Sequence, residues 1–283
     1  MIRRPANAGG KLTVSPFPVL AAWFARWKAD LHRRSVALTS WIEDHLGLLA
    51  FAWLALMASL LAYKVSRLMV PVHGAFDMVQ LVLPYVFIAL APIAGFMIGR
   101  AAFLGNRTQP EFRFALFGRW REIERQQAEA HPSFGPTGFL TSLIVGMIFG
   151  VVMRTGEFIM IQPALNQHAP DWAYTLFLAM SVEIAVMNFF YMICFVMALR
   201  SVPLFPRMLL YVWILDVLCQ LSIARALAGK DLPPSIGEPL ATLLTANLNT
   251  VLISAAIWLP YLILSERVNV TFRHRVPSEA PLA

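Results

Sequence analysis

The chain has 283 residues, of which 58% are hydrophobic and only 14% are charged. Soluble domains carry about 25% charged residues, so this composition excludes an ordinary water-soluble protein and indicates an integral membrane protein. The net charge of +7 does not indicate nucleic-acid binding, because no basic segment carries interleaved aromatic residues. Membrane lipids with anionic headgroups are the simpler partner. We therefore expect an all-α polytopic protein with six transmembrane helices and an N-terminal amphipathic interfacial helix.

The first segment, residues 1–44, carries an amphipathic pattern from Phe17 onward. Arginine, lysine and aspartate fill one side of this helix, and the apolar face consists of Leu20, Trp23, Phe24, Trp27 and Leu31. Tryptophan on an apolar face opposite basic residues is typical of a helix that lies in the membrane interface. A partner-binding helix is the alternative.

Residues 45–99 contain the first two predicted spans, Leu46 to Tyr63 and Met78 to Ile98. About 20 apolar residues at 1.5 Å per residue cross the hydrocarbon layer of about 30 Å. Residues 100–136 follow as a basic amphipathic loop. Its predicted helix has Phe112, Leu116, Trp120 and Ile123 on one face. The charged faces are either solvated or dock a cytoplasmic partner.

Residues 137–274 are predicted to form a four-helix transmembrane domain, and residues 275–283 a tail. The spans are Phe139 to Ile161, Trp172 to Leu199, Met208 to Ala228 and Leu240 to Leu264. Small residues recur at four-residue steps in two places, Gly95 with Gly99, and Ser142 with Gly146 and Gly150. Small side chains let backbones approach closely, so both stripes predict helix contacts.

The distribution of basic residues predicts the topology. With the N-terminus in the cytoplasm, 18 of the 23 lysines and arginines fall in inside segments. The positive-inside rule then favours six spans with both termini cytoplasmic. Arginines outnumber lysines 19 to 4, which indicates a GC-rich bacterial genome and hence a bacterial inner membrane.

Two acidic residues inside spans, Glu183 and Asp216, lie at similar predicted depths on neighbouring antiparallel helices. Buried carboxylates are costly in a bilayer and usually face the bundle interior. They define a candidate intramembrane polar site that takes up a proton, with the polar neighbours Asn188, Tyr191, Gln220, Asn247 and Asn249. In the simpler interpretation each carboxyl is protonated or hydrogen-bonded separately.

The last span carries further polar residues on one face. Asn247, Thr250 and Ser254 share this face, with Thr245 and Asn249 beside it. An unpaired amide costs several kcal/mol in hydrocarbon, so we expect these side chains to face other helices.

Arg154 and Glu157 stand three residues apart near the outer end of their span, where we expect an interfacial ion pair. Arg154 with Arg225 as an outer-face anion site is the alternative. The six histidines are scattered and the two cysteines lie in hydrophobic runs, so we expect no metal site, cofactor or disulfide. We also find no catalytic motif.

Three groups of residues carry a resemblance to a known family. They are Ile257-Trp258-Leu259-Pro260-Tyr261 with Ser265-Glu266-Arg267-Val268 and Thr271-Phe272, then Phe205-Pro206-Arg207, and Gly138 before its span. The segment from Gly138 to Arg273 resembles a bacterial membrane family catalogued as domain of unknown function 2569. The family brings no established activity, so the resemblance implies fold and location.

Two functions from different classes follow. The first is a non-enzymatic subunit or scaffold of a membrane protein assembly, which binds other membrane proteins or a second copy through its glycine stripes. The alternative is a small proton-coupled transporter that uses Glu183 and Asp216. We find no inverted repeat of interrupted helices, which is the usual sign of a transport site, and this favours the scaffold.

Overall fold

The computed structural model describes residues 17–103 and 117–278, with the side chains of residues 17–25, 27–29 and 31 left out. Its elements are α1 (Phe17–Asp44), α2 (Leu46–Ser66), α3 (Ala75–Ala102), β1 (Trp120–Glu122), α4 (Arg125–Ala130), α5 (Phe139–Ile161), α6 (Asp171–Leu199), α7 (Phe205–Leu227), α8 (Pro234–Leu264), α9 (Glu266–Arg273) and β2 (Arg275–Pro277).

Six helices in this part of the chain are long and apolar enough to cross a membrane, namely α2, α3, α5, α6, α7 and α8. This confirms the six predicted spans and the all-α polytopic class. The main difference lies in α8, which begins at Pro234 rather than Leu240. Proline is tolerated in the first turn of a helix, where its missing N–H has no partner to lose.

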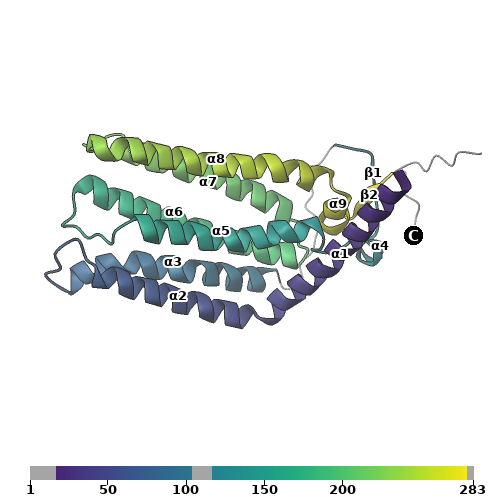
Figure 1. Ribbon diagram of the computed structural model, residues 1–283, viewed down its shortest axis with the longest axis horizontal. Helices are drawn as coiled ribbons and strands as arrows, with labels where there is room; N and C mark the ends of the chain where they lie inside the picture. Colours follow the sequence, from purple (N-terminus) through teal and green to yellow (C-terminus); the bar gives the residue numbers. More distant parts are fainter. Residues whose placement is uncertain (1–16, 104–116, 279–283) are drawn as a thin grey trace, which may run out of the picture.

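The spans stack as successive pairs, α2 with α3, α5 with α6, and α7 with α8 (Figure 1). Helix α6 is central, because it packs against α3, α5 and α7. Helix α8 packs mainly on α7, and α2 and α8 are the least buried spans. One end of the bundle carries α4, α9 and both strands, and we call it the sheet end. The opposite end, with the α2–α3, α5–α6 and α7–α8 connections, is the loop end.

The two stripes of small residues differ in what they contact. A Cβ added to Gly95 would lie 2.2 Å from the backbone oxygen of Phe189, and one added to Gly99 would lie 3.2 Å from Val196. The first stripe is therefore a close contact between α3 and α6, as predicted. A Cβ added to Gly146 or to Gly150 meets nothing within 4 Å in the described structure. Within the described chain the second stripe therefore contacts no helix, and its contact with another protein stays a prediction.

The segment before α4 differs from the predicted loop helix. Trp120 belongs to β1, which pairs antiparallel with β2 so that Glu122 lies opposite Arg275. Ile123 continues this pairing by donating its backbone N–H to the carbonyl oxygen of His274 at 3.0 Å. Gly118 adopts a positive φ of 90°, which is incompatible with a helix. The predicted helix is therefore wrong at Trp120 and Ile123. Its other members, Phe112 and Leu116, lie outside the described residues.

Helix α1 extends away from the bundle at the sheet end (Figure 1). Its C-terminal half is tied to α5, because the backbone N–H of Gly138 donates to Ser35 Oγ at 2.8 Å and Ile42 is buried. The predicted apolar face consists of Leu20, Trp23, Phe24, Trp27 and Leu31, whose side chains lie outside the described ones.

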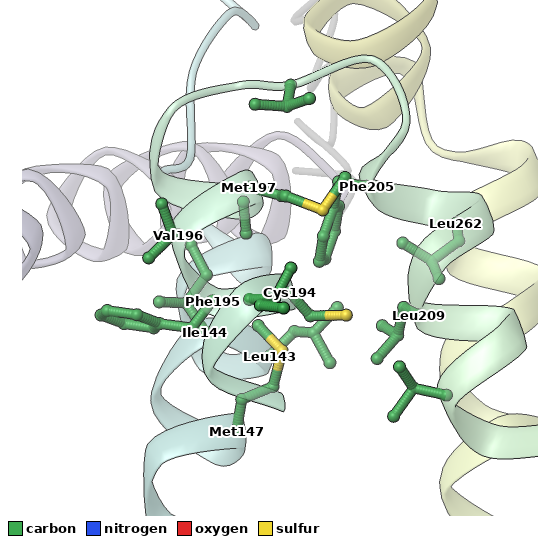
Figure 2. Close-up of a cluster of buried hydrophobic side chains, with 14 of the residues drawn as sticks. Leu143, Ile144, Met147, Cys194, Phe195, Val196, Met197, Phe205, Leu209 and Leu262 are labelled. Carbon is green, nitrogen blue, oxygen red and sulfur yellow. The ribbon is translucent and has the colours of Figure 1, made fainter. Parts of the chain in front are cut away.

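An apolar core at the sheet end joins four spans. Figure 2 shows Leu143, Ile144 and Met147 of α5 with Cys194, Phe195, Val196 and Met197 of α6, Phe205 and Leu209 of α7, and Leu262 of α8. Helix α9 covers this core, since the Phe272 ring lies 5.0 Å from that of Phe205. The core therefore anchors the C-terminal end of α8 to the bundle.

Candidate functional site

The centre of the site is Arg154, whose guanidinium lies between two buried carboxylates. Its Nη1 and Nη2 atoms donate to the two oxygens of Asp216 at 3.1 and 2.6 Å, and Nη1 also donates to Glu183. Asp216 is fully buried and Glu183 is 6% exposed. The structure thus brings the two predicted acids together, with an arginine from a third helix between them.

The position of Arg154 differs from the interfacial ion pair expected from the sequence. It lies about 10 Å along α5 from the loop end, at 1.5 Å per residue, and its side chain points to α6 and α7. Glu157 is exposed instead. The desolvation cost of two buried carboxylates explains the difference, because each needs a nearby cation more than the exposed glutamate does. Arg225 is exposed on α7 and does not join Arg154.

The network has one positive charge against two negative charges when all three groups are ionised. Asp216 and Arg154 form a bidentate pair, which is the strongest geometry for these groups. Tyr191 adds a donor to Asp216 at 3.4 Å. Glu183 shares one guanidinium nitrogen and accepts a hydrogen bond from Gln220 Nε2 at 3.2 Å. Both carboxylates thus share one guanidinium, and the network as a whole carries one surplus negative charge.

The remaining candidates divide into two groups. Asn247 of α8 reaches the network, since its amide donates to Gln220 Oε1 at 3.5 Å. Asn188 lies apart, where it donates to Thr155 Oγ1 at 2.8 Å, and its own Oδ1 has no partner among the described residues. Asn249 is exposed on the other side of α8. Five of the seven candidates thus form the network, Glu183, Asp216, Tyr191, Gln220 and Asn247.

The network forms one wall of a cavity of about 330 Å³ between α5, α6, α7 and α8, which we call the α5–α8 groove. It runs along α5 from Leu143 to Ile161, about 27 Å at 1.5 Å per residue. Arg154 and Glu183 line it, whereas Asp216 is fully buried and is not among the lining residues.

The groove opens sideways between α5 and α8. Gly146, Gly150 and Glu157 line it and are exposed, and they lie within a predicted span. A Cβ added to either glycine meets nothing within 4 Å. The exposed lining of the groove thus belongs to a helix that is long and apolar enough to cross a membrane.

The polar residues of α8 also line this groove. Asn247 also contacts α7 through Gln220, as expected from the spacing. Thr250 and Ser254 border the cavity, and the Thr250 hydroxyl donates to Ala246 of its own helix, which corrects the expectation for these two residues. Thr245 and Asn249 are exposed. The physical reason is that α8 packs mainly on α7, so its side toward α5 borders a cavity.

Aromatic rings close the groove at the sheet end. The ring of Phe139 on α5 stacks on that of Trp258 at 5.0 Å and meets Tyr261 edge-on at 5.1 Å. Helices α5 and α8 are therefore in contact at this end and diverge along the groove.

A second polar cluster lies at the loop end around Asp77. Its carboxylate accepts the backbone N–H of His73 at 2.9 Å and the amide of Gln167 at 3.2 Å, and lies 3.1 Å from His168 Nε2. This cluster has no local signal in the sequence, because Asp77 and His73 lie far along the chain from Gln167 and His168. It joins the α2–α3 and α5–α6 connections. Among the described residues, no three histidine, cysteine or acidic side chains are placed to hold a metal ion.

The residues that carried the family resemblance meet at the sheet end, where the Phe205 and Phe272 rings lie 5.0 Å apart and a Cβ added to Gly138 would lie 3.3 Å from Arg267 Nε. A buried asparagine lies next to them in the sequence. Asn269 is fully buried, donates to the carbonyl oxygens of Ile263 and Ser265, and accepts from Arg273 and Arg275. Burial, together with charge repulsion from Arg275 and Arg207, lowers the pKa of Arg273 to about 10. These contacts fold the chain back under α8, beside the residues that carried the resemblance.

Residues 137–273 match the model of a family described as Protein of unknown function (DUF2569), which confirms the resemblance found in the sequence. No curated protein and no solved structure matches the chain. The matched segment contains α5 to α9 and therefore the whole charged network and its groove.

Proposed function

We propose that this chain, whose residues 137–273 belong to the DUF2569 family, is a small carrier that admits a hydrophobic molecule from the bilayer into the α5–α8 groove. In this proposal it is not an enzyme, and it lies in a bacterial inner membrane with both termini cytoplasmic. Glu183 and Asp216 form its protonatable site, as in the transporter alternative from the sequence.

One observation carries the proposal: Arg154 and Glu183 line a cavity whose exposed side consists of residues of a candidate span, so that in a bilayer this side would face the hydrocarbon layer. An ion network that only stabilises the fold needs no cavity that opens beside it, because contact with solvent or lipid weakens the interactions between its charges. A volume of about 330 Å³ falls at the lower end of the range for small-molecule sites, roughly 300 to 1,000 Å³. Apolar walls with few polar groups are also typical of such sites.

The test is binding of a neutral fluorescent probe, N-phenyl-1-naphthylamine, to the full chain in lipid nanodiscs, with empty nanodiscs subtracted. Gly150→Leu places a side chain in the groove and should weaken binding by about tenfold or more, because nothing else occupies this space. Gly156→Leu is the matched control, since Gly156 lies on the same helix, has equally open surroundings and does not line the groove. Equal binding by both variants would refute the proposal.

A membrane assembly subunit, the function first favoured from the sequence, is supported by a separate observation. Asn249 is exposed near the middle of α8, within a predicted span. An amide facing hydrocarbon is costly, and a helix from another subunit would supply its partner. Native mass spectrometry tests this function: Asn249→Leu should dissociate any complex, whereas an unchanged mass would exclude this surface.

A further inference from the structure

We infer that the α5–α8 groove binds a monovalent amphiphilic cation more tightly than a neutral molecule of the same shape, and that this cation replaces a proton on Glu183. This inference rests on the proposed function and adds the charge of the ligand and the residue that senses it. Three features of the groove carry the argument: its charge, its aromatic lining and the position of Glu183.

The charge of the groove favours a cation. Arg154 pairs with both Asp216 and Glu183, so one positive charge stands against two carboxylates and one negative charge is in excess. A lone ionised carboxylate at this depth is costly, and either a proton or a bound cation removes that cost. Glu157, also in the lining, adds a second acidic group at the open side.

The groups around Glu183 set this balance. Helix α5 contributes Arg154 and Glu157, α6 contributes Tyr191, and α7 contributes Asp216 and the Cys219 thiol. The groove face of α8 contributes neutral side chains, among them Asn247 and Ser254. Arg154 is thus the cation that these elements place at the groove, and its single charge is shared between Asp216 and Glu183.

The lining suits an organic cation better than a hydrated metal ion. Tyr191, Trp213 and Trp258 line the groove together with aliphatic side chains. Aromatic faces attract ammonium and phosphonium groups through their quadrupole, and the apolar walls accommodate the substituents of such a cation. A strongly hydrated metal ion would lose its water shell here without enough oxygen ligands.

Glu183 is the acid that meets the ligand. It lines the groove, whereas Asp216 is fully buried and absent from the lining. When the cation enters, the neutral carboxyl of Glu183 releases its proton to water and the resulting carboxylate pairs with the cation. One positive charge leaves and one enters, and no bond other than the O–H bond is broken.

The experiment measures binding of tetraphenylphosphonium to the full chain in phosphatidylcholine nanodiscs, by calorimetry in two buffers of different ionisation enthalpy. The buffers report the number of protons released per bound cation. We expect release to approach one proton at low pH, and the affinity to weaken by up to about tenfold for each unit of pH decrease, because cation and proton compete for one site.

Three variants assign the exchange to its residue. Glu183→Gln should lose the proton release and weaken binding by at least about tenfold, the equivalent of one ion contact. Glu183→Asp keeps the carboxylate and should keep the proton release. Asp171→Asn removes an exposed acid at the start of the same helix, paired with Lys230, and should behave as wild type.

Two isosteric probes separate this inference from the proposed function. Tetraphenylborate is an anion and tetraphenylmethane is neutral, and both match the cation in shape. Equal binding of all three probes, with Gly150→Leu blocking each, would overturn the cation inference and leave the carrier proposal intact. If all three probes bind and Gly150→Leu weakens none of them, both the cation inference and the carrier proposal are overturned. Cation binding that is unchanged in Glu183→Gln would overturn the assignment of the exchange to Glu183.

Discussion

At the scale of single residues, Arg154 compensates two carboxylates that come from different helices. Arg154→Met should lower the free energy of unfolding by about 3 to 5 kcal/mol, because it leaves buried acids without a cation. The double variant Arg154→Met with Asp216→Leu should recover most of this loss, since it removes a whole ion pair.

Thermal unfolding in mild detergent measures both variants. A double variant that is less stable than Arg154→Met alone would show that Asp216 is stabilised by something other than Arg154.

Asn269 connects α8, α9 and β2 through hydrogen bonds to Ile263, Ser265, Arg273 and Arg275. Asn269→Ala leaves these groups unpaired in a buried position and should cost about 2 to 3 kcal/mol. Hydrogen exchange should then accelerate across α9, with Thr242→Ala as the control because Thr242 is exposed on α8 and bonds only within its own helix. Similar exchange in the two variants would contradict the role of Asn269.

The sequence predicted some of these residues and missed others for physical reasons. Glu183 and Asp216 stood out because carboxylates are rare inside spans. The role of Arg154 was missed because a nearby Glu157 offered a local pair, although the charge balance of two buried acids demands a cation. Asp77 and His168 were missed because their contact joins connections that are far apart in the chain.

At the scale of the elements, the two glycine stripes give opposite predictions. Gly95→Ala should destabilise the protein by about 1 to 3 kcal/mol, because the new Cβ would lie 2.2 Å from the Phe189 carbonyl oxygen on α6. Gly146→Ala should change the stability by about 0.5 kcal/mol or less, since nothing lies within 4 Å.

The denaturation midpoints of Gly95→Ala and Gly146→Ala, measured in the same detergent, test this difference in stability. Equal destabilisation would mean that α5 has a partner helix along its stripe.

The spans were predictable because an apolar run of membrane length allows few other structures. The small-residue stripes were ambiguous, because the same spacing either admits a neighbouring backbone, as in α3, or opens a groove, as in α5. The helix expected at Trp120 was wrong because the strand partner, β2, lies near the C-terminus. Local periodicity contains no information about such a distant partner.

At the scale of the whole molecule, the proposed topology makes the two ends of the bundle differ in access. Ala130 lies at the sheet end and Gly229 at the loop end, and both are exposed. Each can be replaced by a cysteine that reports access from one side. In intact cells an impermeant maleimide should label Gly229→Cys alone, since the basic segments place the sheet end in the cytoplasm.

Both positions should react in permeabilised cells. The native Cys194 and Cys219 lie inside spans, and a variant without them provides the background. Labelling of Ala130→Cys from outside would reverse the topology.

The ratio of one arginine to two acids also determines the energetics of transport, if the proposed exchange operates. Whether a proton or a monovalent ligand occupies Glu183, the loaded site has the same total charge. A complete cycle therefore moves no net charge across the membrane and is electroneutral. We expect a pH gradient to drive uptake into proteoliposomes, whereas a valinomycin-induced potassium diffusion potential should leave the rate unchanged.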